Sequence, residues 1–301
     1  MFKRVGLFLL VNMLVIVVGA TAISIIMRMF GLEPYATQHG INYGSLMIIC
    51  LVWGMAGSFV SLMISKFMAK TMFKLQVLEP NGPNAELVRR VHQLAQRAGL
   101  SKMPEVAIYN SPEVNAFATG PSRNNSLVAV STGLLQNMNS EEAEGVLAHE
   151  VAHIANGDMV TMALIQGVVN AFVIFFARVV TLIIDNFLRK DDGPGLGFFA
   201  YIMLNNLFHI IFGILASPVV FAFSRWREYR ADAGGAQLAG KHKMIAALEA
   251  LKRTYERAEV KSEINDSSVR TMKISSHTKM SELFSTHPTL DKRIEALKRM
   301  G

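Results

Sequence analysis

One short motif holds the residues of this chain that are best suited to metal chemistry. His149, Glu150 and His153 form the pattern H-E-x-x-H. On a helix, residues four apart lie one turn above each other, so both imidazoles can bind one zinc ion from the same side. Glu150 lies about 100° further round the helix, where its carboxylate can take a proton from a water molecule without binding the metal. The motif predicts a zinc hydrolase, although an ordinary amphipathic helix can carry it by chance.

The residues around the motif predict the helix that it needs. Asn139 or Ser140 can cap the start of a helix, and the acidic residues that follow favour its positive end. Apolar residues recur at helical spacing through the motif, and Gly157 offers a stop or a hinge. We therefore expect the two imidazoles to lie on one face of a helix that ends near Gly157.

A site with two histidines needs a third protein ligand, and Glu228 and Asp232 are the candidates. These carboxylates are four residues apart, on one face of a helix. One of them can bind the metal, while the other accepts a hydrogen bond from the far ring nitrogen of a ligand histidine. A solvated surface of a charged helix is the alternative interpretation. Cys50 is the sole cysteine and lies in an apolar run, which excludes a cysteine zinc site.

The composition is that of a membrane protein. Hydrophobic residues make up 51% of the 301 positions, and the mean hydropathy is +0.31. A net charge of +7 can indicate binding to nucleic acid. In a membrane protein it more often marks basic loops that stay in the cytoplasm, so we expect the lipid bilayer as a partner and no nucleic acid.

Four apolar runs predict four transmembrane helices. They cover about residues 5–27, 43–64, 159–184 and 198–223, and each is long enough to cross a bilayer. We interpret the first as a retained anchor because it is longer than the apolar core of a signal peptide and lacks a clear cleavage site. For the last two, a buried hairpin of soluble helices is the alternative.

Basic residues predict the orientation in the membrane. Lys66, Lys70 and Lys74 follow the second run, and residues 225–230 contain three arginines after the fourth. The positive-inside rule places both clusters in the cytoplasm. Two spans between the H-E-x-x-H motif and Glu228 then bring both segments to the same face, whereas a single span would separate them.

These observations predict four consecutive parts. We expect an N-terminal transmembrane hairpin over residues 1–75, a cytosolic part with the H-E-x-x-H helix over 76–158, a second transmembrane hairpin over 159–223, and a cytosolic part with the third ligand over 224–301. The patterns predict a mainly α, α+β domain with helices over 85–98, 134–138 and 242–258, strands over 106–109 and 127–130, a strand or edge segment over 115–120, and a last helix that Pro288 opens.

Three segments together resemble a known family. They are residues 148–158, residues 228–232 and the triplet Thr286-His287-Pro288. The set is similar to that of the membrane zinc metalloproteases that include the HtpX proteases and the type-1 CAAX prenyl proteases. The resemblance covers nearly the whole chain, including the two apolar hairpins.

The resemblance implies a fold, a metal and an activity. It implies a gluzincin-like endopeptidase domain in which His149, His153 and Glu228 hold one Zn²⁺ and Glu150 is the general base. It also implies an enzyme of the bacterial inner membrane that degrades misfolded membrane proteins under stress. Together with the basic residues, it places the active site on the cytoplasmic side. Asp232 is then the carboxylate that supports a ligand histidine.

Two further segments are candidates for contact with substrate. The oxyanion that develops during peptide hydrolysis needs a hydrogen-bond donor beside the metal, and we expect His287 to supply it. A histidine in a His-Pro turn at a helix start is the alternative. Asn115, Ala116 and Phe117 can form an edge that receives the substrate as an added strand. An ordinary core strand is the equal alternative.

Two other classes of function use the same residues. A membrane metal sensor or transporter should carry ionisable ligands within its spans, and only Arg178 and His209 lie there. A proteolytically inactive adaptor would be expected to lack the base, whereas Glu150 is present. We therefore predict an α-helical integral membrane protein with a zinc endopeptidase domain.

Overall fold

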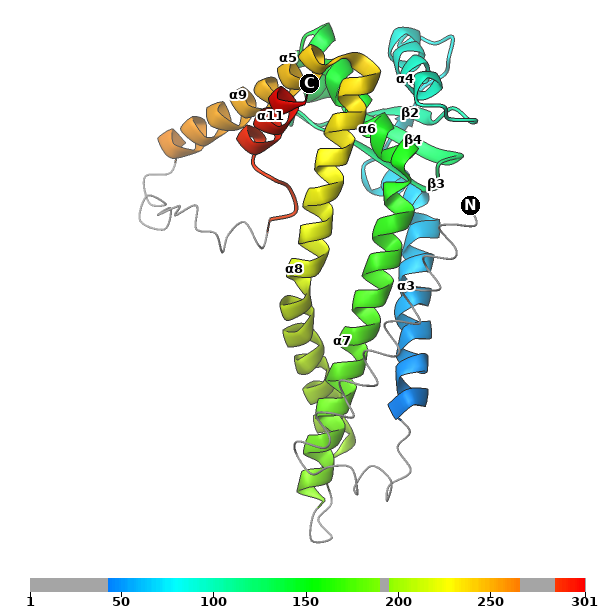
Figure 1. Ribbon diagram of the computed structural model, residues 1–301, viewed down its shortest axis with the longest axis vertical. Coiled ribbons are helices and arrows are strands. Elements are labelled where there is room, and N and C mark those ends of the chain that lie inside the picture. The colour runs from blue at the N-terminus through cyan, green and yellow to red at the C-terminus, as the bar shows by residue number, and fades with distance from the viewer. Residues whose placement is uncertain (1–42, 190–194, 266–284, 301) are drawn as a thin grey trace. The chain divides into compact units, whose positions relative to one another are not determined.

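The computed structural model describes residues 43–189, 195–265 and 285–300, and most of its elements are helices (Figure 1). In chain order they are α3 (Tyr43–Met72), β1 (Gln76–Val77), α4 (Ala85–Arg97), β2 (Glu105–Tyr109), β3 (Ala116–Ser122), β4 (Asn125–Ser131), α5 (Thr132–Asn137), α6 (Ser140–Asn156), α7 (Asp158–Leu188), α8 (Phe198–Ala239), α9 (Lys241–Asn265) and α11 (Leu290–Arg299). Two compact units result. The helical unit holds the described residues up to Ser61 and from Met162 to Val220, and the α+β unit holds Leu62–Thr161 and those from Phe221 onward.

Long apolar helices make up the helical unit. Three helices among the described residues are long and apolar enough to cross a membrane: Gly44–Met72, Asp158–Leu188 and Phe198–Ala239. They cover the second, third and fourth predicted spans, whereas the first, residues 5–27, lies outside the described residues. The length and apolar composition of these helices therefore identify the chain as a membrane protein.

Within the helical unit, α3 and α7 pack closely while α8 presents apolar side chains outward. Met47 and Cys50 of α3 form a buried cluster with Phe175 of α7. On α8, Phe199 is 81% exposed and Met203 is 71% exposed. An apolar surface of this kind is costly in water and suits contact with lipid.

Helix α8 is longer than the fourth apolar run. It continues without a break through Pro218 to Ala239. We expected Glu228 and Asp232 to follow the span, and the structure places them on the same continuous helix as the apolar run. Their spacing of four residues puts them on one helix face, as predicted.

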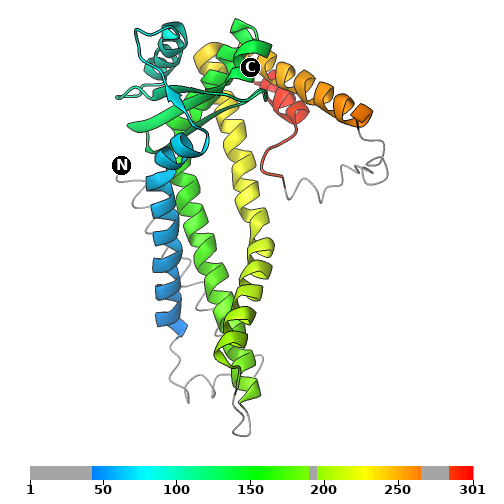
Figure 2. The same cartoon turned by 180° about the vertical axis from the view of Figure 1, so that it is seen from behind.

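A four-stranded sheet lies in the α+β unit (Figure 2). Its strands follow the order β1-β2-β4-β3. Strands β2 and β4 are parallel, and β3 pairs antiparallel with β4, with Ala116 opposite Val130. The predicted strands over 106–109 and 127–130 are confirmed, and the segment over 115–120 forms the edge strand β3. The short strand β1 was not predicted, because two residues carry too little pattern.

Helix α6 lies at the centre of the α+β unit. Its apolar side, which includes Leu147, Val151 and Ile154, is buried in the main core with residues of α4, β2 and β4. Its neighbours approach to backbone contact: a Cβ on Gly235 of α8 would lie only 3.2 Å from the backbone nitrogen of His149. The same Cβ would lie 2.8 Å from Sδ of Met244, so a side chain at that position would require both Met244 and α6 to shift.

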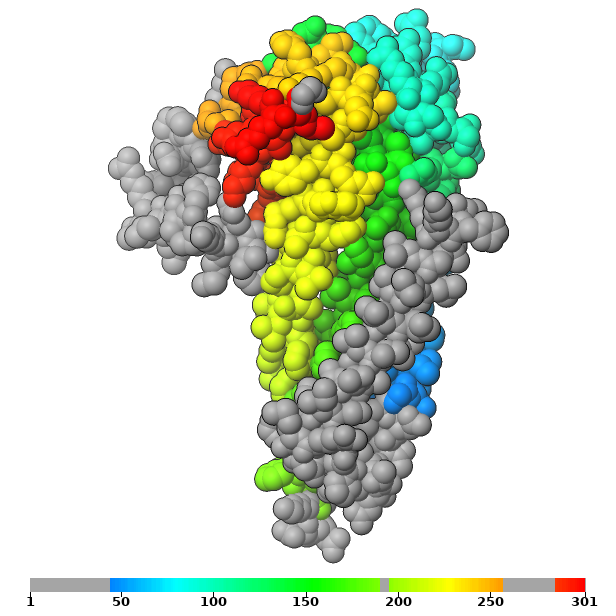
Figure 3. Space-filling model, in the orientation of Figure 1, coloured from blue at the N-terminus to red at the C-terminus, as the bar shows by residue number. Residues whose placement is uncertain are grey.

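The helices α9 and α11 complete the unit. Met244 and Leu248 of α9 form a buried cluster with Ile294 and Leu297 of α11. Figure 3 shows α11 in red, lying against the orange and yellow surface of the preceding helices. We expected Pro288 to open this last helix. It begins instead at Leu290, and its N-cap is Thr289.

Candidate metal site

The start and the end of α6 are both defined by local interactions. Asn139 is the N-cap, and its side chain accepts hydrogen bonds from the backbone nitrogens of Glu141 and Glu142, each at 3.0 Å. Glu142 in turn accepts from the backbone nitrogen of Asn139, which completes a capping box. Gly157 ends the helix in the left-handed conformation at φ 69°. The two histidines of the motif therefore lie in the last turns of a well-defined helix.

The two histidines and Glu228 converge on one point. The Nε2 atoms of His149 and His153 are 3.1 Å apart. One oxygen of Glu228 lies 3.4 Å from His149 Nε2, and the other lies 3.4 Å from His153 Nε2. All three side chains are buried, and their ligand atoms lie within 4.8 Å of one another. Two imidazoles and one carboxylate are a donor set that suits zinc, so the residues present fit the metal.

Two further carboxylates orient the imidazoles. Asp232 lies 2.9 Å from His149 Nδ1, and Asp158 lies 2.7 Å from His153 Nδ1. A proton held on each Nδ1 by its carboxylate leaves the lone pair of Nε2 free for a metal ion. The supporting role of Asp232 was expected from the sequence. Asp158 was missed, although its position directly after the helix-ending Gly157 was a usable signal.

Electrostatics matches this arrangement. Burial alone would raise the pKa of Glu228, but hydrogen bonds from the three histidines around it lower that pKa well below the usual carboxyl range. Burial disfavours a charged His149, yet hydrogen bonds to Asp232 and Glu228 outweigh it and raise the pKa of His149 to about 9 without a metal. A metal ion that binds here therefore displaces a proton.

Arg293 of α11 reaches into the same cluster from the far end of the sequence. Its Nε and Nη2 donate to the two oxygens of Asp232 at 2.8 and 2.6 Å. Its Nη1 lies 3.6 Å from Glu228. Burial would raise the pKa of Asp232, but the guanidinium and His149 together lower it. Arg293 was not predicted, because a sequence pattern does not show which distant helix closes over a site.

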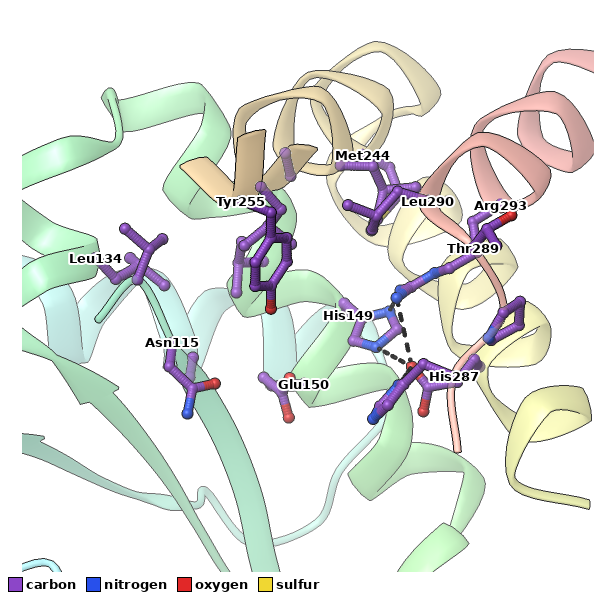
Figure 4. Close-up of a pocket in the computed structure, with 18 of the residues that line it drawn as sticks. Asn115, Leu134, His149, Glu150, Met244, Tyr255, His287, Thr289, Leu290 and Arg293 are labelled. Atoms are coloured by element: carbon purple, nitrogen blue, oxygen red, sulfur yellow. Dashed lines mark hydrogen bonds and ion pairs between the residues drawn. The ribbon is translucent and has the colours of Figure 1, made fainter. Parts of the chain in front are cut away.

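Two cavities meet at this cluster. The larger has a volume of about 480 Å³ and the smaller about 270 Å³. Glu150, which is half-buried, lines both, as do Asn115 and His287. Figure 4 shows Glu150 beside His149 on α6, with Asn115, which directly precedes β3, across the cavity. Glu150 is thus beside the candidate metal ligands and outside their set, as the sequence predicted.

The two cavities differ in their walls. The larger is mainly apolar, and Tyr255 of α9 points into it (Figure 4). Its aliphatic wall consists of Leu134, Val146, Met244, Ala247, Leu248, Leu251 and Leu290. The smaller is lined by Ala116, Phe117 and Ala118 of β3 together with His153, Asp158 and Arg227. The same candidate ligands are therefore bordered by an apolar recess and by a more polar one.

His287 lies beside the candidate ligand Glu228. Its Nδ1 is 3.1 Å from a carboxylate oxygen of Glu228, while 59% of its side chain is exposed. The segment that carries it is held by Arg225, which donates to the backbone oxygen of Ser285 at 2.8 Å. The structure therefore brings together every residue that the sequence singled out as a candidate. Their roles stay predictions.

Comparisons with known proteins show which family the chain is similar to. The model of peptidase family M48 matches residues 81–301. The chain is 51% identical over 304 residues to a protease HtpX homolog of Bacillus subtilis (strain 168), with 99% of each chain covered. It is also 51% identical over 300 residues to the protease HtpX of Chromohalobacter salexigens, with 98% of this chain and 97% of that one covered.

A solved structure shares the fold. The crystal structure of Ste24p from S. mikatae matches with a TM-score of 0.58 and 20% sequence identity. The match covers 96% of this chain, which spans 66% of the length of that one. At this level of identity the likeness concerns the fold alone.

Proposed function

Because the chain belongs to peptidase family M48 and is a membrane metalloprotease, we propose that it is a zinc-dependent endopeptidase whose metal is held by His149, His153 and Glu228. The observation that carries this proposal is the buried convergence of these three side chains beside Glu150, at the meeting point of two cavities. A metal sensor would need the ligands alone. Two cavities that share His149, Glu150 and Glu228 in their linings provide room for a polypeptide.

The proposed chemistry divides between the metal and the chain. Zn²⁺, when bound, supplies a Lewis acid that polarises the peptide carbonyl and makes water more acidic. Glu150 accepts the proton of the attacking water and passes it to the leaving nitrogen. His287 can keep Nδ1 on Glu228 and turn Nε2 toward the oxyanion, which would make it the electrostatic stabiliser that we expected.

Substrate binding is proposed to use the sheet edge and the larger cavity. Strand β3 pairs with β4 on one side and is the last strand of the described sheet. A peptide can add to such an edge, along Asn115, Ala116 and Phe117. A bulky apolar side chain next to the scissile bond would then enter the larger cavity, because burial against its aliphatic wall is favourable.

The place of the enzyme in the cell is also a proposal. Hairpins over 1–75 and 159–223 would anchor protease parts over 76–158 and 224–301 in the inner membrane of a bacterium. The basic residues that follow the apolar parts of α3 and α8 support a cytoplasmic active site. A protease in this position can reach misfolded membrane proteins under stress, which is the quality-control role that we propose.

Three full-length preparations test this function. The wild-type protein, purified in detergent, should contain about one zinc per chain and cleave casein until a chelator removes the metal. A variant with both His149 and His153 replaced by Ala should contain no zinc. Glu150→Gln should keep the metal and lose at least about a hundredfold in rate, the lower end of general-base contributions. Wild-type activity in a zinc-loaded Glu150→Gln protein would refute the mechanism and favour a metal sensor.

A further inference from the structure

We propose that Arg227 is a substrate-binding residue, whose guanidinium donates to a main-chain carbonyl oxygen of the peptide in the smaller cavity. This inference rests on the proposed protease function and adds a contact that the metal site itself does not require. Arg227 immediately precedes Glu228 on α8 and lines the smaller cavity together with Glu150 and His153.

The guanidinium of Arg227 has more donors than partners. Its Nη2 lies 3.2 Å from a carboxylate oxygen of Glu228. Its Nε is buried and has no hydrogen-bond partner in the described part of the chain. A guanidinium carries five N–H groups, and a buried donor of a charged group is costly when it stays unpaired. The side chain is 23% exposed and lines the smaller cavity, so the N–H groups of its Nη atoms that Glu228 does not use can meet an acceptor that arrives with the bound molecule.

Glu228 does not depend on Arg227 for its charge. Nitrogens of His149 and His153 lie 3.4 Å from its carboxylate, and His287 lies at 3.1 Å. Arg293 adds a second guanidinium at 3.6 Å. Arg293 is also bound through two hydrogen bonds to Asp232, so it has little freedom to meet a ligand. Arg227 is thus the arginine of this cluster that can change partners.

The charges of the cavity favour a neutral carbonyl as the partner. The carboxylates of Glu150, Asp158 and Glu228 line the same cavity. A substrate carboxylate would be repelled by them at close range, whereas a carbonyl oxygen accepts a hydrogen bond without a net charge. Every peptide bond supplies such an oxygen. Strand β3 forms another wall of the cavity, so a peptide added to β3 would place its main chain within this space.

The test separates substrate binding from support of the metal. Arg227→Gln is placed in the full-length, zinc-loaded Glu150→Gln protein, in which turnover is expected to be at least about a hundredfold slower. The binding of fluorescently labelled casein to this protein is measured by anisotropy. Loss of one charged hydrogen bond should weaken binding about ten- to a hundredfold. In the active protein the same change should raise KM by a similar factor while kcat changes less. Zinc content should be unchanged.

Two matched variants complete the design. Arg230 lies on the same helix, with its guanidinium 4.6 Å from the ring of Trp226, and does not line either cavity. Arg230→Gln should therefore bind casein as the unmodified protein does. Arg227→Lys keeps the charge and should recover part of the affinity. If Arg227→Gln does not fold, the same binding measurement on Arg227→Lys decides, because full wild-type affinity in that variant would contradict a contact that depends on the guanidinium.

The outcomes distinguish the two proposals. If the wild-type protein does not cleave casein when loaded with zinc, the protease function fails and the role of Arg227 fails with it. If the wild type cleaves and Arg227→Gln binds casein equally well, the Arg227 inference alone is overturned. Loss of zinc in step with loss of binding would show that Arg227 supports Glu228 instead, and would also overturn it.

Discussion

Replacement of Arg293 by methionine should destabilise the protein by about 3 kcal/mol. The change leaves Asp232, which is 2% exposed, as a buried carboxylate without the guanidinium that donates two hydrogen bonds to it. Removal of one partner of a buried ion pair costs about 3–5 kcal/mol. Asp232 keeps its hydrogen bond with His149 at 2.9 Å, so we expect the lower end of that range. In a unit of this size, this corresponds to a fall of about 6–12 °C in the thermal midpoint.

Thermal unfolding of the full-length protein in detergent measures this effect. The metal is first removed with a chelator, because a ligand that binds only the folded state would add its own stabilisation. Arg299→Met is the matched control on the same helix, since Arg299 is 81% exposed and pairs with Glu295 at the surface. That variant should lie within about 0.5 kcal/mol of the wild type. Equal midpoints for Arg293→Met and Arg299→Met would refute the reasoning.

The remaining predictions concern the metal and the sheet. Glu228→Gln should lower zinc affinity and casein cleavage together. Asp232→Asn should lower zinc affinity only about ten- to a hundredfold. The zinc affinity of both variants is measured by competition with a chelator. Burial opposes ionisation of Glu105, but hydrogen bonds from Lys66 and Lys70 lower its pKa below 4.5. Its stabilising effect is therefore complete above pH 4.5 and is lost as the pH falls through the lowered pKa. Thermal midpoints of wild type and Glu105→Gln should differ at pH 7 and converge in acid; a constant difference would contradict this.

The sequence indicated the candidate metal ligands better than it indicated the residues that hold them in position. Helical spacing placed His149 and His153 on one face, and the structure confirms that geometry with Nε2 atoms 3.1 Å apart. Spacing could also nominate Glu228 and Asp232, because residues four apart on a helix share a face. It could not decide which of them faces the histidine Nε2 atoms. That depends on how α8 packs against α6, where Gly235 permits backbone contact.

Contacts between segments far apart in the chain could not be predicted from the sequence. Arg293 is 61 residues from Asp232 and 144 from His149. A basic residue in an amphipathic helix is usually exposed to solvent. Nothing in the sequence therefore distinguishes the buried Arg293 from its exposed neighbour Lys292. Asp158 is different, because it follows His153 by five residues and only the turn at Gly157 brings them together. Local turn chemistry could have indicated it.

The separation between Asp232 and Arg293 also has a consequence during synthesis. A ribosome that has completed α8 has already made both histidines and Glu228, so the three candidate metal ligands exist in the nascent chain. The arginine that neutralises Asp232 comes 61 residues later. At roughly 5–20 residues per second, this delay is about 3–12 s. Until then the carboxylates of Asp232 and Glu228 lack the guanidinium that lies beside them in the complete protein, and α11 can close over the candidate ligands only after all three have been made.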